Sequence, residues 1–347
     1  MRIFKLCFLA FAISFVSCDS NDGNDAPLGS YDNGILVLNE GDALRGSLTY
    51  ISDDLEPVQQ DVFSVVNPDQ MPGGFLQSMF FSGERAFIIS NGSNKVVVVN
   101  RYTLEFITEI TTGFDHPRYG VAMDGKAYIT NMANFMTETD DFITVVDLAS
   151  LSVESPIELN DFAERIVASN GKLYVANGAF GSGDSITVID AASKTVEDEI
   201  LVGIAPNSLE ISGNTLYVLC SGFGSDSKMI RINLNDLADY TEVTFPASMT
   251  NAFNLDIDES SAYFSVGGKV YKIDADADSV SDSPLFDTQS DSDYIGYGFA
   301  VHNNRVYISE ATEDFSSDGK IYIYSTSGEF LDDIPVGLGP NSFYFND

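Results

Sequence analysis

The side chains that most often perform catalysis are few in this sequence. Among its 347 residues there are two histidines, His116 and His302, three cysteines and no tryptophan. A zinc site or a catalytic triad needs several such groups within reach of one another. The repeat described below predicts that the two histidines lie in turns on opposite faces of the molecule. We therefore predict a non-enzymatic protein with no catalytic residue, no metal ligand set and no cofactor.

Two further features suggest chemistry at first sight. Cys220 has no histidine predicted beside it, so we interpret it as a buried structural thiol and not as a nucleophile. The run Asp274-Ala-Asp276-Ala-Asp278 begins like a calcium loop, but an EF-hand needs Gly where Ser279 stands and Glu where Leu285 stands. We predict a solvated acidic loop there, and whether the Asp-rich residues 274–293 bind a divalent cation stays open.

The charge balance excludes one class of partner. The chain has 17 Lys and Arg residues against 52 Asp and Glu residues, a net charge of −35. Binding along a nucleic-acid backbone needs basic side chains that neutralise phosphates. We therefore predict that the protein has no nucleic-acid partner.

A repeat of about 44 residues organises the chain. Each unit contains a short strand with an aromatic residue in its second position, and these aromatics fall at positions 87, 128, 174, 217, 263 and 307. A further strand follows in each unit, at residues 96–100, 143–147, 186–190, 230–233, 270–274 and 321–325. Four short strands in such a length match a β-propeller blade better than a helical repeat.

The two ends of the chain supply one more blade. Residues 340–345 repeat the pattern of residues 206–211, which is a first strand. The second and third strands that should follow are found at the N-terminus, as residues 35–39 and 47–51. The sequence thus predicts an all-β, seven-bladed propeller of four-stranded blades, closed by pairing of the N- and C-terminal strands, which leaves no open sheet edge.

Several of these segments resemble a known family. Residues 125–131 with 143–147, and residues 171–177 with 186–190, are similar to YVTN/YncE-type propeller repeats. The opening residues 33–41 resemble the start of Bacteroidetes YncE-like surface lipoproteins. This resemblance implies the fold for nearly the whole mature chain. In organisation the chain is similar to BtuG-type proteins, which capture corrinoids beside a TonB-dependent transporter.

The N-terminus has the features of a lipoprotein signal. Arg2 and Lys5 flank a short apolar run, and Phe15-Val16-Ser17-Cys18 resembles a bacterial lipobox with Phe in place of the usual Leu. We predict a signal peptide over residues 1–17, lipidation of Cys18, an acidic tether over residues 18–30 and the propeller over residues 31–347. A plain signal peptide with an incidental cysteine is the alternative. The acidic tether resembles a surface-export signal and favours the outer face of the outer membrane, with a periplasm-facing lipoprotein as the alternative.

A ligand site is predicted at one end of the propeller channel. The loop before each inner strand and the loop between the second and third strands emerge on the same face. The positions ten residues before the repeated aromatics form a polar ring, rich in amides and poor in carboxylates, although Glu164 belongs to it. The predicted ring residues are Gln77, Arg118, Arg165, Asn207, Tyr297, Asn341 and either Asn251 or Asn254. The alternative is that these groups cap strand ends and hold channel water.

Loops between the second and third strands add further candidates. They place an aromatic among Gly, Ser or polar residues, and two of the preceding strands end in asparagine. The candidates are Phe135, Phe180, Phe223, Phe315, Asn131 and Asn177. Exposed aromatics around amides suit a planar or partly apolar ligand. The alternative is that each Phe folds back over its own blade.

Three functions are compatible with these features. The first is a cell-surface lipoprotein that binds a small nutrient, with a corrinoid as the best candidate, and passes it to a TonB-dependent outer-membrane transporter. The second is a protein-interaction scaffold. The third is a metal-assisted hydrolase or lyase built on Glu40, Glu164, Glu310 and His116. Ligand, partner and oligomeric state are left open.

Overall fold

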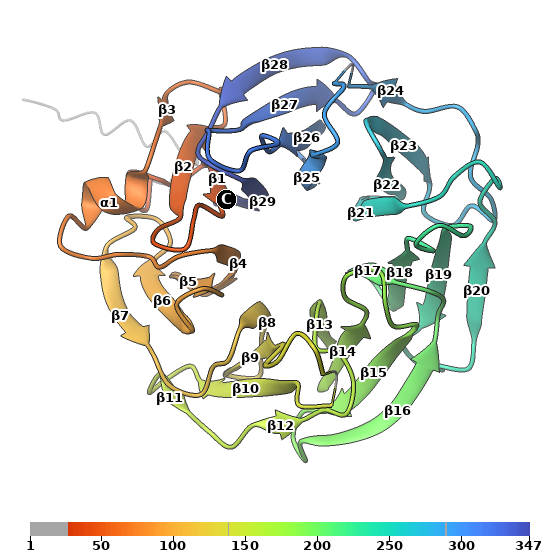
Figure 1. The fold of residues 1–347 in the computed structure, drawn as a ribbon, viewed down its shortest axis with the longest axis horizontal. Helices are drawn as coiled ribbons and strands as arrows, with labels where there is room; N and C mark the ends of the chain where they lie inside the picture. Colours follow the sequence, from red (N-terminus) through yellow and green to blue (C-terminus); the bar gives the residue numbers. More distant parts are fainter. Residues whose placement is uncertain (1–26, 138, 289) are drawn as a thin grey trace, which may run out of the picture.

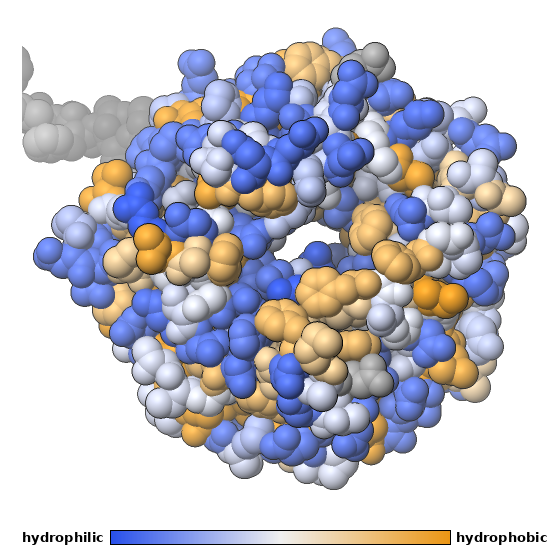
Figure 2. All heavy atoms as spheres, viewed as in Figure 1, coloured by the Kyte–Doolittle hydropathy of each residue, from blue (hydrophilic) through white to orange (hydrophobic). Residues whose placement is uncertain are grey.

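The computed structural model describes residues 27–137, 139–288 and 290–347. The predicted signal peptide, Cys18 and most of the tether lie outside these residues. The described residues form seven antiparallel sheets around a central channel (Figure 1). The space-filling view shows this channel open at its centre (Figure 2). The prediction of a seven-bladed propeller is confirmed.

Blade 1 is built from both ends of the described chain. Its strands, from the channel outward, are β29 (Pro340–Phe345), β1 (Gly34–Asn39), β2 (Ser47–Ser52) and β3 (Val58–Gln59). Ile35 pairs with Phe345, and Val37 pairs with Phe343. This pairing confirms the predicted closure of the ring by the terminal strands.

The other six blades each consist of consecutive strands that follow one another from the channel outward. Blade 2 is β4 (Leu76–Ser82), β5 (Arg85–Ser90), β6 (Lys95–Asn100) and β7 (Phe106–Ile110). Blade 3 is β8 (Pro117–Met123), β9 (Lys126–Asn131), β10 (Phe142–Asp147) and β11 (Ser152–Val153), with β12 (Ile157–Glu158) also paired to β10. Blade 4 is β13 (Ile166–Ser169), β14 (Lys172–Asn177), β15 (Ser185–Asp190) and β16 (Thr195–Leu201).

Blades 5 to 7 follow the same order. Blade 5 is β17 (Pro206–Ser212), β18 (Thr215–Cys220), β19 (Lys228–Asn233) and β20 (Tyr240–Val243). Blade 6 is β21 (Ala252–Asp258), β22 (Ser261–Val266), β23 (Lys269–Asp274) and β24 (Phe286–Asp287). Blade 7 is β25 (Ile295–His302), β26 (Arg305–Glu310), β27 (Lys320–Ser325) and β28 (Phe330–Pro335).

The repeated aromatic is the residue that joins one blade to the next. Tyr128 of blade 3 packs in one apolar cluster with Leu173 and Val175 of blade 4. Tyr307 of blade 7 packs in the same way with Ile35 and Val37 of blade 1. A strand covered by blades on both faces needs a continuous apolar run, which explains why Val96 to Val99 of β6 are all fully buried.

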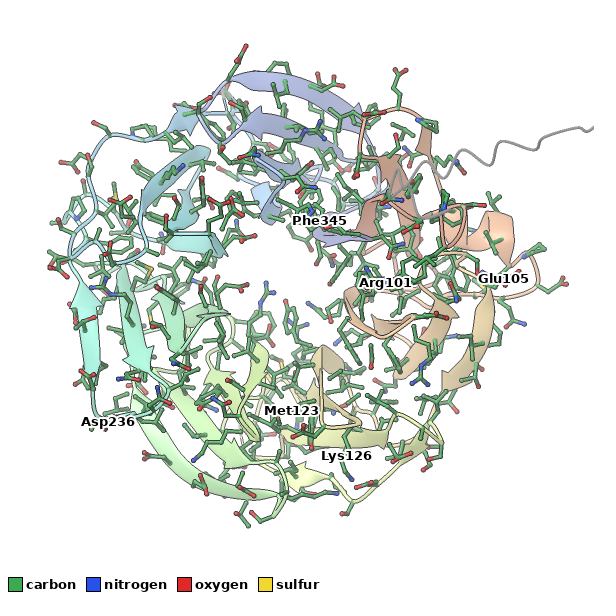
Figure 3. All side chains as sticks on the ribbon, turned by 180° about the vertical axis from the view of Figure 1, so that it is seen from behind. Arg101, Glu105, Met123, Lys126, Asp236 and Phe345 are labelled. Carbon is green, nitrogen blue, oxygen red and sulfur yellow. The ribbon has the colours of Figure 1, made fainter. Side chains whose placement is uncertain are left out.

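The turns between first and second strands form the face opposite the predicted site. In blades 3 and 4 these turns are Asp124-Gly125 and Asn170-Gly171, and all four residues have positive φ. That conformation is typical of a tight two-residue hairpin, whose twist matches the twist of the strands. Seen from behind, Met123 and Lys126 mark the β8–β9 turn (Figure 3).

A short helix covers the outside of blade 1. It is α1 (Val62–Val66), and its buried residues Val62 and Phe63 pack with Leu48 of β2. None of the helices in the described part of the chain has the length and apolar character needed to cross a membrane.

Candidate functional site

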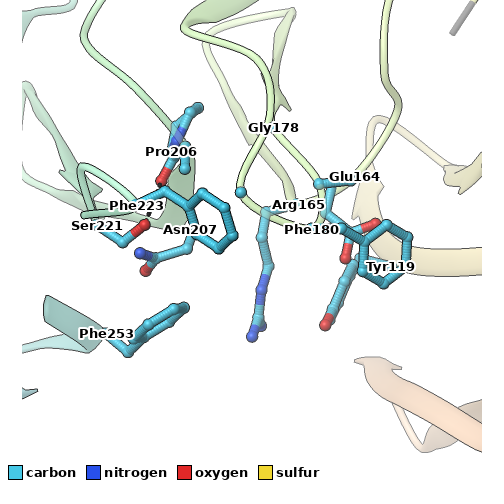
Figure 4. Close-up of a pocket in the computed structure, with 13 residues that line it drawn as sticks. Tyr119, Glu164, Arg165, Gly178, Phe180, Pro206, Asn207, Ser221, Phe223 and Phe253 are labelled. Carbon is cyan, nitrogen blue, oxygen red and sulfur yellow. Dashed lines mark hydrogen bonds between the residues drawn. The ribbon is translucent and has the colours of Figure 1, made fainter. Parts of the chain in front are cut away.

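One hollow, which we call the main hollow, lies where the predicted site was expected. It has a volume of about 530 Å³, and both kinds of loop named above line it. Residues at the start of the inner strands of blades 3 to 6 contribute Tyr119, Glu164, Arg165, Asn207 and Phe253 (Figure 4). The loops after β14 and β18 contribute Phe180 and Phe223.

A second hollow adjoins the main one. Its volume is about 420 Å³, and it shares Arg165 and Phe253 with the main hollow. Its other walls include Asn251, Asn254 and Tyr297. We call the two hollows together the funnel. Because they share two side chains, a ligand larger than either hollow could extend over both.

Phenylalanine rings form the apolar wall of the funnel. Phe180 is 70% exposed, Phe223 is 66% exposed and Phe253 is 44% exposed. Phe180 and Phe223 are held in the left-handed backbone region, with φ of 50° and 40°. That region is unfavourable for a bulky residue, and such strain is often found at ligand sites. The Phe223 ring lies against Gly181 in the loop of the neighbouring blade, and the Phe180 ring lies beside Phe135 in the loop of blade 3.

The other two predicted phenylalanines lie near the funnel without lining it. The Phe135 ring centroid is 6.1 Å from that of Phe180 and 4.9 Å from that of His116. Phe315 packs edge-on against Tyr297, with the two centroids 5.5 Å apart. Both rings thus support residues of the site from the outside.

Phe253 was not among the predicted residues. It nevertheless occupies the position ten residues before Tyr263, which is the rule that identified Gln77 and Asn207. The prediction preferred an amide there and chose Asn251 or Asn254. Asn251 is exposed in the second hollow, whereas the amide of Asn254 donates to the backbone oxygen of Gly296 at 2.8 Å.

The amides of the ring mainly join neighbouring blades. Asn207 Nδ2 donates to the backbone oxygen of Ala252 at 2.9 Å, and Asn341 Nδ2 donates to that of Leu76 at 2.8 Å. Gln77 Nε2 donates to the Tyr119 hydroxyl at 3.0 Å. Most of these amide donors therefore bind neighbouring strands, as the strand-capping alternative predicts.

The expectation that Asn131 and Asn177 face the funnel is wrong. Both side chains are fully buried inside their own blades. Asn131 Nδ2 donates to Thr144 Oγ1 at 2.9 Å, while Asn177 Oδ1 accepts from Thr187 Oγ1 at 2.8 Å. The asparagine that ends each of these strands thus holds the next strand through a side-chain hydrogen bond. Cys220 takes the same place in blade 5, where burial raises the pKa of its thiol to about 12.

Two carboxylates lie at the ring, Glu164 at a ring position and Glu40 beside it, and both have partners. Glu164 binds Arg118 through two hydrogen bonds, and Tyr297 donates its hydroxyl proton to Glu40. Burial raises the pKa of Glu40, whereas the Tyr297 hydrogen bond and the charge of Arg118 oppose this effect. Both carboxylates are therefore engaged by neighbouring side chains, Glu164 by Arg118 and Glu40 by Tyr297.

Two more carboxyl groups stand on the inner strands around the channel. Burial raises the pKa of Glu210 on β17 to about 8, and the charge of Asp256 adds to this while Arg165 opposes it. Burial also raises the pKa of Asp256 on β21 to about 6, although a hydrogen bond from the backbone N–H of Val301 opposes the shift.

The two histidines are in separate places. His116 Nδ1 lies 2.9 Å from Asp115 Oδ1 near the funnel. His302 Nε2 lies 2.8 Å from Asp347 Oδ2, and its ring stacks on Phe345 at a centroid distance of 4.0 Å. Within residues 27–137, 139–288 and 290–347, no three or more His, Cys, Asp or Glu side chains are arranged to hold a metal ion.

Comparison with known proteins places the chain among propellers. It is similar to apo AztD from Citrobacter koseri (15% identity, TM-score 0.54, covering 89% of this chain and 96% of that chain). It is also similar to a hypothetical selenium-binding protein from Sulfolobus tokodaii (10% identity, TM-score 0.67, 88% and 92% covered) and to dihydro-heme d1 dehydrogenase NirN in complex with DHE (14% identity, TM-score 0.57, 92% and 76% covered). At these identities the likeness shows the fold alone.

Comparison with sequences gives the family. The curated proteins include no match to this chain. Residues 33–345, nearly the whole described propeller, match the model of the domain of unknown function DUF5074, and the chain belongs to that family.

Proposed function

We propose that this protein is a non-enzymatic cell-surface lipoprotein that binds a small nutrient in the funnel and passes it to an outer-membrane transporter. The observation that carries the binding function is the group of three exposed phenylalanines, Phe180, Phe223 and Phe253, around one hollow of about 530 Å³. Binding sites for small molecules are typically concave, largely apolar and equipped with a few polar groups that orient the ligand. Arg165 and Asn207 are such groups here.

A corrinoid is our candidate ligand. The support is the resemblance of residues 33–41 and of the repeats to YncE-like surface lipoproteins of the BtuG type. The funnel adds support, because a corrin ring is broad, partly apolar and rimmed by amide groups that donate and accept hydrogen bonds. The two adjoining hollows offer both aromatic walls and polar groups to such a ring.

The binding test is calorimetry with cobinamide and with cobalamin. Because β29 closes onto β1 within residues 33–345, a chain that starts after Cys18 keeps every described strand and needs no detergent. We expect heat of binding from the wild type, and an affinity about tenfold lower after Phe180→Ala with Phe223→Ala. Phe330→Ala is the matched control, because Phe330 is 50% exposed on the outer strand β28.

Two outcomes of the calorimetry would contradict the proposal. Absence of heat with both corrinoids would remove the corrinoid assignment. Unchanged affinity in the double variant would move binding away from the funnel.

The lipid anchor has its own test. Cys18→Ala in the full-length chain should release the protein from the membrane fraction, and the wild type should co-purify with a TonB-dependent transporter from solubilised outer membranes. A Cys18→Ala protein that stays in the membrane fraction would overturn the lipid anchor.

A further inference from the structure

Among the residues that the structure describes, Arg165 lines the funnel without an ion pair to a carboxylate. Its side chain lines both hollows and extends into the open space between Phe253 and Tyr119 (Figure 4). Its guanidinium carbon lies 4.1 Å from the centroid of the Tyr119 ring, a cation–π contact that orients the group without neutralising it. The ion pairs found among the described residues do not include Arg165.

None of the carboxyl groups near Arg165 forms an ion pair with it among the described residues. Glu164, its neighbour in sequence, is bound through both oxygens to Arg118. Glu210, whose charge would interact with Arg165, has a pKa raised to about 8 by burial and is mostly protonated near neutral pH. Asp256 accepts a hydrogen bond from Val301 N–H of blade 7, and Asp293 is exposed at the rim of the second hollow.

Arg165 lies in a chain with a net charge of −35. The long-range field of such a chain repels anions, so an anion binds only where a local contact outweighs that repulsion. A guanidinium beside aromatic rings, partly shielded from water, offers that contact through charge-assisted hydrogen bonds, which are about twice as strong as neutral ones.

We propose that the funnel selects a ring-containing apolar ligand that carries an anionic group, with Arg165 binding the anion and Phe180, Phe223 and Phe253 enclosing the rings. This inference deepens the proposed binding function and rests on it. The anionic group belongs to the class of carboxylates, sulfonates and phosphates, which the planar donor fork of arginine binds through two oxygens.

Two fluorescent probes separate the anion from the rings. Anilinonaphthalene sulfonate carries a sulfonate on an aromatic framework, and phenylnaphthylamine is the same framework without it. Both are titrated against the chain that starts after Cys18, as wild type and as Arg165→Gln. We expect Arg165→Gln to weaken binding of the sulfonate about tenfold and to leave binding of the neutral probe within about twofold.

Three further variants keep this test interpretable. Arg165→Lys should restore only part of the sulfonate affinity, because it returns the charge but not the planar fork that binds two oxygens. Phe180→Ala with Phe223→Ala should weaken both probes, which locates them in the funnel. Arg85→Gln, which removes a positive charge from the start of β5 on the opposite face, should change neither probe. Thermal unfolding and circular dichroism establish that each variant is folded.

The inference is overturned if the wild type binds neither probe, if Arg165→Gln leaves sulfonate binding unchanged, or if it weakens both probes equally. Its failure is distinguishable from failure of the proposed function. Sulfonate selection through Arg165 without heat from either cobinamide or cobalamin removes the corrinoid and keeps the anion. Heat from cobinamide or cobalamin, with no effect of Arg165→Gln on sulfonate binding, keeps the corrinoid and removes the anion.

Discussion

Arg118 of blade 3 and Glu164 of blade 4 form a two-pronged ion pair beside the main hollow. Arg118 Nε lies 2.8 Å from Glu164 Oε2, and Nη2 lies 2.7 Å from Oε1. The side chains are only 13% and 12% exposed. A third donor of the same guanidinium, Nη1, binds Gln77 Oε1 of blade 2. One arginine thus joins three blades at the entrance to the channel.

Removing one partner of this pair should destabilise the propeller strongly. Glu164→Gln leaves the Arg118 charge buried without its carboxylate, which costs about 3–5 kcal/mol in the free energy of unfolding. Urea unfolding measures this change. The matched control is Glu242→Gln, because the Lys228–Glu242 pair has side chains 42% and 52% exposed and should contribute no more than about 1 kcal/mol. Equal small losses in the two variants would contradict the structural role of the Arg118 pair.

The stability of the fold should fall as pH rises through neutrality. In the folded chain the pKa of Glu210 is raised from 4.5 to about 8 by burial, so between these values the folded state binds a proton that the unfolded state has lost. The stability from this group is complete below about pH 4.5 and is lost as pH rises towards about 8. Asp141, with a pKa raised to about 7, and Asp256, with one raised to about 6, act in the same direction.

Glu210→Gln tests this dependence. The free energy of unfolding of the variant, measured by urea at a series of pH values, should fall less steeply than that of the wild type between about pH 5 and about pH 8. A residual slope from Asp141 and Asp256 should remain. Glu199→Gln, on the exposed outer strand β16, should give a curve parallel to the wild type. A Glu210→Gln curve that is also parallel would show that this carboxyl group keeps its ordinary pKa.

The fold could be predicted because one residue in each repeat performs the same packing task. Tyr128, Tyr174 and Tyr307 each fill the seam to the following blade, so the period of the aromatics is the period of the blades. Closure could be predicted for a similar reason, since residues 340–345 carry the pattern of an inner strand without its partners. These signals are local in sequence and need no knowledge of distant contacts.

The site was predicted less completely because its chemistry depends on contacts between blades. The sequence placed Arg118, Arg165, Phe180 and Phe223 on the correct face. It did not indicate that Glu164 is bound by Arg118, because those residues are 46 positions apart. Asn131 and Asn177, which end their strands, were expected to be ligand donors, whereas the direction of each side chain depends on the hydroxyl that the next strand offers.

Because Asn177 lies inside its blade and not in the funnel, its substitution should change the stability of the fold without changing ligand binding. Asn177 Nδ2 donates to the backbone oxygen of Phe162 at 2.8 Å, and Asn177 Oδ1 accepts from Ser185 and Thr187. Asn177→Ala leaves these buried groups without partners and should cost about 2–3 kcal/mol. Affinity for the fluorescent probes should stay within about twofold. Asn214→Ala, in the exposed β17–β18 turn, should change neither quantity. A selective loss of probe affinity after Asn177→Ala would restore this residue to the site.

A pair of glycines tests what positions the Phe223 ring. Both Gly181 and Gly224 have positive φ, of 84° and 92°, so alanine at either position costs about 1 kcal/mol or more in backbone strain. Only at Gly181 would the added Cβ meet the ring, 2.4 Å from Phe223 Cδ2, whereas nothing lies within 4 Å at Gly224. Gly181→Ala must therefore displace Phe223 and should weaken binding of the neutral probe as much as Phe223→Ala does. Gly224→Ala should leave that affinity within about twofold, because its strain does not reach the ring. Equal losses in the two glycine variants would mean that loop strain, and not contact with Gly181, determines how Phe223 faces the funnel.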